Sequence, residues 1–254
     1  MIEGVRWITK IGRDGLWRVQ YHQADCLQQL SRMRGDLAGK VDLVILDPPY
    51  EDWDMWESNS TFWEYIFEAC SPQANIICFS KQPFSAGLWR SFPDIRWRLV
   101  WAFSNGGAWI SKNLPLVSFQ DITVYTPGVG GIFNARTGGE YAETTKPMKR
   151  STKKWKGYCE EGRNFVPSEE GTWLRDVIFV NKPTGCPIGV KPVALLELLL
   201  KVYSNEQSLI LDPFAGRGTT LMAALHLDRR AIGFEIDSKV YAFGELELDK
   251  ESIQ

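Results

Sequence analysis

Apolar positions along this chain fall into two patterns that alternate with one another. Short continuous apolar runs predict strands that are buried on both faces, and they cover 17–20, 41–46, 75–79, 96–103, 119–125, 177–180, 208–211 and 231–234. Apolar residues at three- or four-residue spacing predict helices, which are expected just after Asp25, over 61–69, 83–92, 193–203 and 219–227, and from about Asp237. This alternation predicts an α/β fold with a largely parallel sheet.

One region, 128–177, does not continue the alternation. It begins with several glycines, and a charged stretch with interleaved aromatic residues follows, which is typical of an inserted region. Basic and aromatic side chains together suit contact with a phosphate backbone and unstacked bases. The candidate nucleic-acid contacts are Arg136, Lys146, Lys149, Arg150, Lys153, Lys154, Trp155 and Lys156. A solvated loop without specific contacts is an equally good interpretation of this stretch alone.

Composition and charge narrow the class of protein. The 254 residues suffice for one α/β domain with an elaboration. No apolar run approaches the roughly 18 residues needed to cross a bilayer, and the first residues lack the pattern of a signal peptide. The five cysteines form no Cys-x-x-Cys pair and predict reduced thiols in a cytoplasmic protein, and with only two histidines no metal site is expected. A net charge of −2 argues against coating nucleic acid by charge alone, but allows one basic face.

The tetrapeptide Asp47-Pro48-Pro49-Tyr50 closes the apolar run 41–46. Sites in open α/β sheets form just beyond the carboxyl ends of such strands. The two prolines fix φ and remove amide donors, so that carbonyl acceptors are left beside a carboxylate and an aromatic ring. These groups suit an exocyclic amino group on a flat heterocycle. Taken alone, the motif is explained equally well as a rigid turn.

A second motif combines a glycine turn with a later acid. The strand 208–211 leads into Asp212-Pro213-Phe214-Ala215-Gly216-Arg217-Gly218-Thr219-Thr220, and the strand 231–234 ends at Glu235. This order of a strand, a glycine turn, a helix, a second strand and an acid is the pattern of a nucleoside-binding unit. In such a unit the acid accepts hydrogen bonds from both ribose hydroxyls. No lysine precedes Thr219 and the third glycine of a dinucleotide fingerprint is absent, which favours a nucleoside without phosphates over ATP or NAD. A glycine needed only for tight strand-to-helix packing is the alternative.

Together these motifs resemble the S-adenosylmethionine-dependent DNA amino-methyltransferases, the adenine-N6 and cytosine-N4 family, in the beta-class motif order. The resemblance is carried by Asp47 to Tyr50, by Asp212 to Thr220, and by Ala231-Ile232-Gly233-Phe234-Glu235-Ile236-Asp237. Ala24-Asp25-Cys26-Leu27 and Val190-Lys191-Pro192-Val193 are further matches. The pattern covers 15–127 and 178–245.

The resemblance implies a Rossmann-like methyltransferase fold, with a mixed, mostly parallel seven-stranded sheet flanked by helices. In the circularly rearranged motif order, residues 1–127 form the catalytic half and 178–254 form the cofactor-binding half of the same domain. Residues 128–177 are then the variable region for target recognition and DNA contact.

The resemblance also implies roles for single residues. Asp47 and the carbonyl of Pro48 accept hydrogen bonds from the target amino group, Pro49 stiffens the turn, and Tyr50 stacks on the base. Glu235 holds the ribose of S-adenosylmethionine and Asp25 its adenine amino group. The full set of expected cofactor residues is Asp25, Cys26, Asp47, Lys191, Pro192, Asp212, Pro213, Phe214, Ala215, Gly216, Gly218, Thr219, Thr220, Glu235 and Ile236.

The expected activity is site-specific methylation of N6 on an adenine flipped out of double-stranded DNA. Asp at position 47 favours adenine in the family, whereas cytosine-N4 is the first alternative. An RNA or protein amine as substrate, and an inactive DNA-binding relative, are the others. A bacterial or phage-encoded cytoplasmic protein is expected, with no membrane partner. A homodimer and a cognate restriction endonuclease stay open as partners.

Overall fold

The computed structural model describes residues 6–12, 14–49, 60–91, 95–104, 116–134, 174–182 and 189–251. The strands are β1 (Arg6–Ile11), β2 (Trp17–Gln23), β3 (Val41–Leu46), β4 (Cys70–Ser80), β5 (Ile95–Ala102), β6 (Phe119–Tyr125), β7 (Val177–Phe179), β8 (Leu209–Asp212) and β9 (Arg230–Glu235). The helices are α1 (Cys26–Leu37), α3 (Ser60–Ala69), α4 (Phe84–Ser91), α5 (Val193–Tyr203), α6 (Thr219–His226) and α7 (Ser238–Lys250). The expected α/β alternation is therefore confirmed.

The nine strands of the described residues belong to one mixed sheet in the order β1-β2-β9-β8-β3-β4-β6-β5-β7. Pairing is parallel from β2 through β9, β8 and β3 to β4, and again between β5 and β7. It is antiparallel between β1 and β2 and on both sides of β6. The mostly parallel class is confirmed, and the expected count of seven was too low because β1 and β7 extend the two edges. β1 has no continuous apolar run, since most of its side chains are exposed.

The strand order places early and late parts of the sequence side by side. β3, which precedes Asp47, pairs with β8, which leads into the glycine turn. β2 pairs with β9 along its length, so Gln23 lies opposite Glu235. Because these pairs are parallel, their carboxyl ends meet at one edge of the sheet. The motifs of both sequence halves therefore lie at the same edge.

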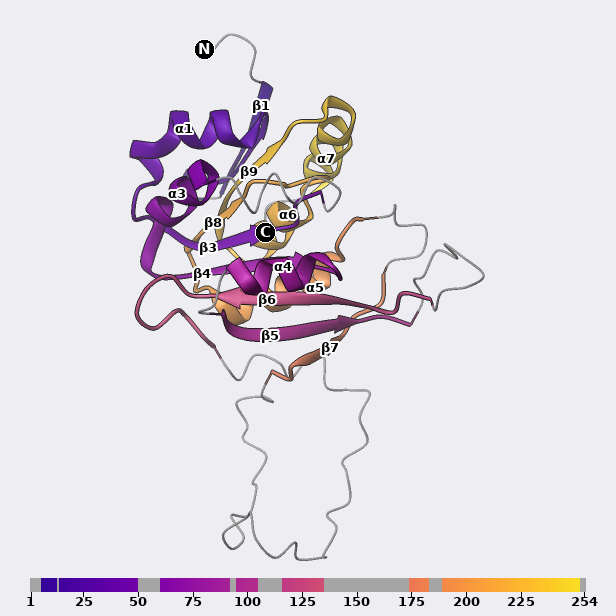
Figure 1. Ribbon diagram of the computed structural model, residues 1–254. Coiled ribbons are helices and arrows are strands. Elements are labelled where there is room, and N and C mark those ends of the chain that lie inside the picture. Colours follow the sequence, from indigo (N-terminus) through magenta and orange to yellow (C-terminus); the bar gives the residue numbers. More distant parts are fainter. Residues whose placement is uncertain are drawn as a thin grey trace, which may run out of the picture.

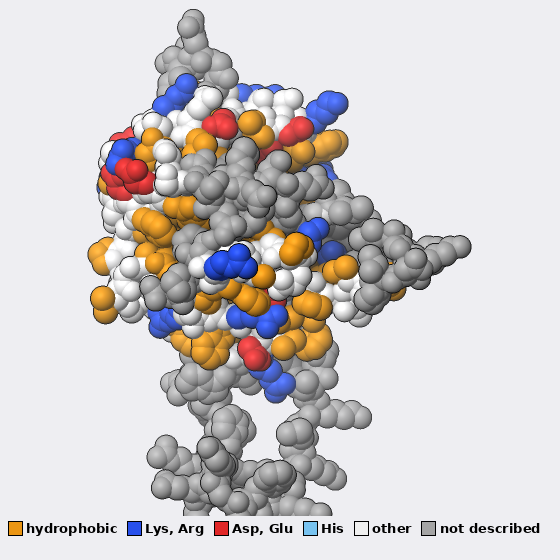
Figure 2. Space-filling model, in the orientation of Figure 1, with side chains coloured by type: hydrophobic (Ala, Val, Ile, Leu, Met, Phe, Trp, Pro, Cys, Tyr) orange, Lys and Arg blue, Asp and Glu red, His pale blue; other side chains and the backbone are white. Residues whose placement is uncertain are grey.

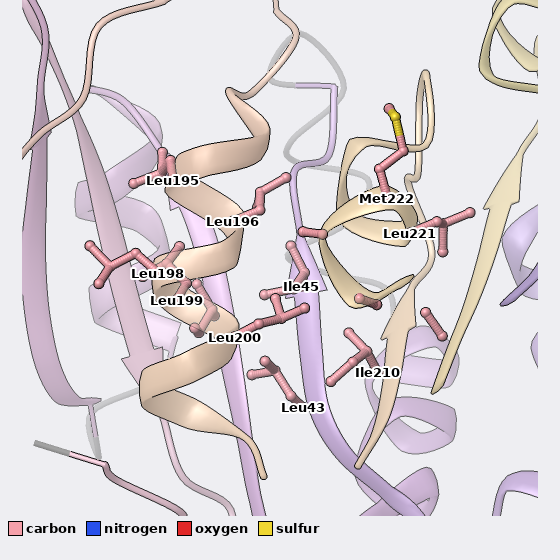
Figure 3. Packing of buried hydrophobic residues seen from close by; sticks show 14 of the residues in the cluster. Leu43, Ile45, Leu195, Leu196, Leu198, Leu199, Leu200, Ile210, Leu221 and Met222 are labelled. Atoms are coloured by element: carbon pink, nitrogen blue, oxygen red, sulfur yellow. The ribbon is translucent and has the colours of Figure 1, made fainter. Parts of the chain in front are cut away.

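Helices cover both faces of the sheet (Figure 1). α1, α3 and α4 pack on one face, and α5, α6 and α7 pack on the other. Figure 3 shows leucines of α5 against Leu43 and Ile45 of β3 and Ile210 of β8. The α5 leucines are at most 1% exposed, and burying each contributes about 1.5–3 kcal/mol. The core thus fixes α5, and with it the Lys191-Pro192 segment before it, against the central strands.

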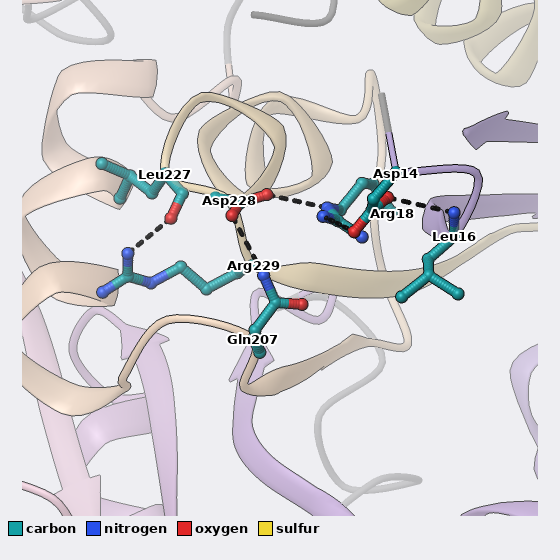
Figure 4. A network of polar contacts seen from close by, with 7 residues as sticks. All are labelled: Asp14, Leu16, Arg18, Gln207, Leu227, Asp228 and Arg229. Atoms are coloured by element: carbon teal, nitrogen blue, oxygen red, sulfur yellow. Dashed lines mark hydrogen bonds and ion pairs between the residues drawn. The ribbon is translucent and has the colours of Figure 1, made fainter. Parts of the chain in front are cut away.

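A polar cluster joins the amino ends of the strands, opposite the edge with the motifs (Figure 4). Buried Arg18 donates hydrogen bonds at 2.8 Å to both Asp14 and Asp228. Gln207 donates to the other carboxylate oxygen of Asp228 at 3.0 Å. The cluster connects the turns before β2, β8 and β9. It thereby fixes the amino ends of these strands, at the opposite end from the motifs.

The β7 edge differs from the covered centre of the sheet. Trp97, Phe119 and Phe179 are exposed on β5, β6 and β7. Figure 2 shows hydrophobic side chains beside lysine and arginine in the lower part of the described surface, where these strands lie. The exposed surface of this edge therefore combines apolar groups with basic and acidic ones (Figure 2). None of the described helices is long and apolar enough to cross a membrane.

Candidate functional site

A pocket of about 380 Å³ opens at the carboxyl ends of β3, β4 and β8. Its walls come from sequence-distant elements: the turn after β3, the end of β4, the segment that leads into α5, the glycine loop between β8 and α6, and helix α7. Its lining residues are Ile45, Asp47, Phe79, Gly189, Val190, Lys191, Leu196, Asp212, Phe214, Ala215, Gly216, Arg217, Thr219, Thr220, Val240 and Phe243. The volume lies in the usual range of small-molecule sites.

Asp47 forms an ion pair with Lys191 inside this pocket. The Lys191 side chain is 8% exposed and that of Asp47 is 24% exposed. The ammonium group also donates to the carbonyl of Gly189 at 3.3 Å and lies 4.9 Å from the centre of the Phe79 ring. Pro48 is buried and Pro49 is exposed. Lys191 therefore fixes the Asp47 carboxylate from the side of α5.

The glycine loop packs tightly against β9. Gly216 and Gly218 have φ values of +53° and +76°, which favour glycine, and Gly218 caps the amino end of α6. A Cβ on Gly233 of β9 would lie 2.8 Å from the Cβ of Ala215. The amide of Ala215 donates to the carbonyl of Phe234 at 2.9 Å. The loop is thus held close to the strand that ends at Glu235.

Asp212 and Glu235 bring two acidic side chains with perturbed pKa values to this region. Burial raises the pKa of Asp212 to about 7, although hydrogen bonds from the Thr220 side chain and the Phe214 amide oppose the shift, and the charges of Asp47 and Glu235 add to it. Burial also raises the pKa of Glu235, which accepts a hydrogen bond from the Asp237 amide at 2.7 Å. Asp47, Asp212 and Lys191 line the pocket, and Glu235 ends the neighbouring strand β9, so that acidic groups outnumber the one lysine and suit a ligand that carries positive charge.

The end of β2 adjoins the end of β9. The amide of Ala24 donates to the carbonyl of Glu235 at 2.9 Å. Asp25 caps α1 and accepts a hydrogen bond from the Gln28 amide at 2.9 Å. Cys26 is buried, and burial raises the pKa of its thiol to about 12. Asp25, Cys26 and Glu235 are therefore neighbours at the sheet edge, with Cys26 held as a neutral thiol.

The structure brings many of the predicted residues together, but not all. Those that line the pocket are Asp47, Lys191, Asp212, Phe214, Ala215, Gly216, Thr219 and Thr220. Those described outside its lining are Asp25, Cys26, Pro48, Pro49, Pro192, Pro213, Gly218, Glu235 and Ile236. Tyr50 and the predicted DNA contacts Arg136, Lys146, Lys149, Arg150, Lys153, Lys154, Trp155 and Lys156 lie outside the described residues.

Several lining residues were not predicted. Phe79 ends the apolar run of β4, and its place beside β3 could have been inferred from adjacent parallel strands. Arg217 lies between the two loop glycines. Val240 and Phe243 come from α7, where a three-residue spacing puts them on one face of the helix. That α7 returns to the pocket is decided by tertiary packing.

A sequence model of a family described as DNA methylase matches residues 76–244, which is more than half of the chain. The chain belongs to this family. Its members, the N6/N4 DNA amino-methyltransferases, use S-adenosylmethionine as the methyl donor. The expected family, fold class and cofactor are thereby confirmed.

Several relatives match this DNA methylase over most of its length, among them two from Escherichia coli and Haemophilus parainfluenzae. It is 27% identical to the DNA adenine methyltransferase YhdJ of Escherichia coli K12, across 90% of this chain and 82% of YhdJ. It is 24% identical to the type II methyltransferase M.HpaI of Haemophilus parainfluenzae, across 89% of this chain and 74% of M.HpaI.

Two solved structures share the fold of this DNA methylase. The complex of M1.HpyAVI with SAM has a TM-score of 0.60 at 18% identity, and the match covers 91% of this chain and 99% of that one. The cytosine-N4-specific PvuII DNA methyltransferase has a TM-score of 0.65 at 12% identity, with coverage of 92% and 88%. At these identities the likeness concerns the fold and leaves the target base undecided.

Proposed function

We propose that this DNA methylase transfers a methyl group to the N6 amino group of an adenine flipped out of double-stranded DNA. The observation that carries the proposal is the carboxylate of Asp47, which heads the Asp-Pro-Pro-Tyr turn and lines the pocket together with the glycine loop. An aspartate at this position favours adenine in the family that the motifs resemble. Similarity to YhdJ, named a DNA adenine methyltransferase, over 90% of this chain supports the same choice.

The pocket fits S-adenosylmethionine in charge and in shape. Asp47 and Asp212 line the pocket and Glu235 ends the neighbouring strand, which suits a sulfonium cation, and the glycines of the loop let a ligand approach the backbone closely. S-adenosylmethionine supplies the methyl group when it is bound. In the proposal, Glu235 accepts hydrogen bonds from the ribose hydroxyls, and Asp25 accepts one from the adenine amino group. The loop from Asp212 to Thr220 holds the methionine part, Lys191 and Pro192 form one wall, and Cys26 and Ile236 border the nucleoside.

Asp47 and the carbonyl of Pro48 accept hydrogen bonds from the two hydrogens of the target amino group. In a free base the nitrogen lone pair is delocalised into the ring, and hydrogen bonds from both N–H groups to these acceptors favour its localisation on nitrogen. Lys191 keeps the Asp47 carboxylate in place while it does so. Tyr50 stacks on the base, a contact worth about 1–3 kcal/mol. Positioning both reactants supplies a further share of the rate.

Direct transfer without a covalent enzyme intermediate suits the cysteines of the described part. Burial raises the pKa of both Cys26 and Cys70 to about 12, and it raises the pKa of Cys78 as well. The thiol rather than the thiolate is then present at neutral pH, and a thiol is a weak nucleophile. Nucleophilic cysteine chemistry is therefore not part of the proposal.

DNA contact is assigned to the variable region 128–177 between the two halves 1–127 and 178–254 of the methyltransferase domain. Flipping a base out of a duplex costs a few kcal/mol. The basic and aromatic residues between Arg136 and Lys156 are proposed to offset this cost through phosphate contacts and stacking. Because the named relatives are bacterial, action on DNA in a bacterial cytoplasm is part of the proposal.

Identifying the modified nucleoside tests the function. Duplex DNA incubated with the protein and labelled S-adenosylmethionine is digested to nucleosides, which are separated and identified by mass. N6-methyladenine as the product is expected. Labelled N4-methylcytosine alone would replace adenine by the cytosine alternative, and transfer only to RNA or protein would overturn DNA as the substrate. Binding of S-adenosylmethionine without any transfer would indicate an inactive relative.

A further inference from the structure

Tyr21 connects strand β2 to the glycine loop. It lies in β2, is fully buried, and donates a hydrogen bond from its hydroxyl to the carbonyl of Gly216. The two residues are 195 positions apart in the sequence. Burial raises the pKa of the Tyr21 phenol, so the hydroxyl keeps its proton and remains a donor. Tyr21 therefore contacts the loop at Gly216, which lines the pocket, without lining the pocket itself.

Helix α7 fixes the Tyr21 ring. The rings of Tyr21 and Tyr241 stack with centroids 4.4 Å apart and an angle of 25° between their planes. The Tyr241 hydroxyl donates to the Tyr21 carbonyl at 3.3 Å. A Cβ on Gly244 would lie 2.9 Å from the Tyr21 hydroxyl and 2.9 Å from the carbonyl carbon of Arg217. Strand, loop and helix thus meet with no space for an additional methyl group.

The loop needs such an anchor because its two glycines allow more than one backbone conformation. Glycine adopts positive and negative φ with similar ease, so Gly216 and Gly218 do not by themselves fix the direction of the loop carbonyls. A hydrogen bond to the Gly216 carbonyl selects one peptide orientation. Gly216, Arg217 and Thr219 line the pocket from the same loop, so that orientation also sets the shape of the pocket wall.

We propose that Tyr21 is a positioning residue that holds the glycine loop in its cofactor-binding conformation. It acts through Gly216 and does not touch the ligand. This inference rests on the proposed cofactor site, and it concerns cofactor affinity, not the choice of target base. Removing the hydroxyl should lower affinity because part of the binding free energy would then be spent on ordering the loop.

The chain offers a matched pair of hydroxyl deletions. Tyr21→Phe removes the bond to the loop, whereas Tyr241→Phe removes a bond of the same kind to the backbone of β2 and leaves the loop bond in place. Calorimetric titration of each full-length variant with S-adenosylmethionine measures the dissociation constant. We expect an increase of about threefold to tenfold for Tyr21→Phe, the usual effect of one buried hydrogen bond, and less than about twofold for Tyr241→Phe.

Hydrogen exchange provides a second readout that does not need the ligand. Amides of the loop from Phe214 to Thr219 should exchange faster in Tyr21→Phe than in the wild type or in Tyr241→Phe. A purely structural role would instead lower the melting temperature of both variants without a selective change in the loop or in affinity.

Equal dissociation constants for the wild type and Tyr21→Phe, or equal loop exchange in the two variants, would overturn the positioning role. A wild-type protein that binds S-adenosylmethionine but does not methylate adenine would contradict the proposed function alone. A wild-type protein that does not bind S-adenosylmethionine would overturn both proposals.

Discussion

The ammonium group of Lys191 donates a hydrogen bond to the carboxylate of Asp47 from 144 positions further along the chain. Lys191 lies just before the buried helix α5, and Asp47 follows the buried strand β3, so the packing of α5 on β3 brings the two charges together. The result is a carboxylate with a fixed orientation at the pocket wall.

Replacing Lys191 with methionine should lower the rate of methyl transfer by about tenfold to a hundredfold. A hydrogen bond to a charged group contributes about 1.5–3 kcal/mol, and without it the Asp47 carboxylate is less well positioned. Single-turnover assays at saturating S-adenosylmethionine measure this rate. Lys250→Met, at the exposed end of α7, is the control and should keep the wild-type rate. A wild-type rate in Lys191→Met would contradict the positioning of Asp47 by Lys191.

Replacing Asp47 with alanine should reduce methyl transfer by at least about a hundredfold, the usual cost of removing one group that stabilises charge in the transition state. Binding of S-adenosylmethionine should stay measurable, because the glycine loop and Glu235 are unchanged. Transfer assays and calorimetry on the same preparation separate these effects. Activity that persists in Asp47→Ala would refute the role assigned to this carboxylate.

Stability should depend on pH through Asp212. Its pKa is raised from 3.8 to about 7 in the folded protein, so between these values the folded state holds a proton that the unfolded state has lost. The contribution of Asp212 to stability is therefore fully present below pH 3.8 and is lost as the pH rises through 7. Asp212→Asn does not titrate at this position. The unfolding free energy of the variant minus that of the wild type should therefore increase by up to about 1.4 kcal/mol per pH unit in this window. Urea denaturation at a series of pH values measures the difference, and a flat difference would contradict the raised pKa.

Two helical glycines should respond to alanine in opposite directions. In Gly244→Ala the new Cβ meets the Arg217 backbone and the Tyr21 hydroxyl at 2.9 Å, and such overpacking costs about 1–3 kcal/mol. Among the described residues, no other element comes within 4 Å of the place where a Cβ on Gly35 of α1 would lie, so Gly35→Ala should stabilise by about 0.5–1 kcal/mol. Denaturation midpoints of the two variants measure both effects. A Gly244→Ala protein as stable as the wild type would show that α7 can move away from the loop.

Alanine at Lys149, Arg150, Lys153 and Lys154 should weaken DNA binding and flatten its salt dependence. Removing one phosphate contact should reduce the slope of log affinity against log salt by about 0.9. Fluorescence anisotropy with a labelled duplex at several salt concentrations measures the slope. The double variant Lys40→Ala with Lys250→Ala, at exposed positions elsewhere, is the control. An unchanged slope in the fourfold variant would assign this stretch to a solvated loop.

Much of the fold could be predicted because local patterns report which residues are buried. The run 41–46 predicted β3 with its observed bounds, and the leucine-rich segment 193–203 predicted α5. β1 was missed because its side chains are mostly exposed at the sheet edge. The start of β4 at Cys70 was also missed, since the four residues from Cys70 are partly or fully exposed and Cys70 pairs with Val41 of β3.

The sequence by itself determined the chemistry of the candidate site: the carboxylate of Asp47, the glycines of the loop and the acid Glu235 are local motifs with local backbone requirements. Only the tertiary structure decided their partners. Lys191 reaches Asp47, Tyr21 reaches Gly216, and α7 brings Phe243 to the pocket. The physical reason is that the spacing of apolar residues in the sequence indicates only whether a side chain is buried. The parallel pairing of β2, β9, β8 and β3 determines which distant residue it packs against.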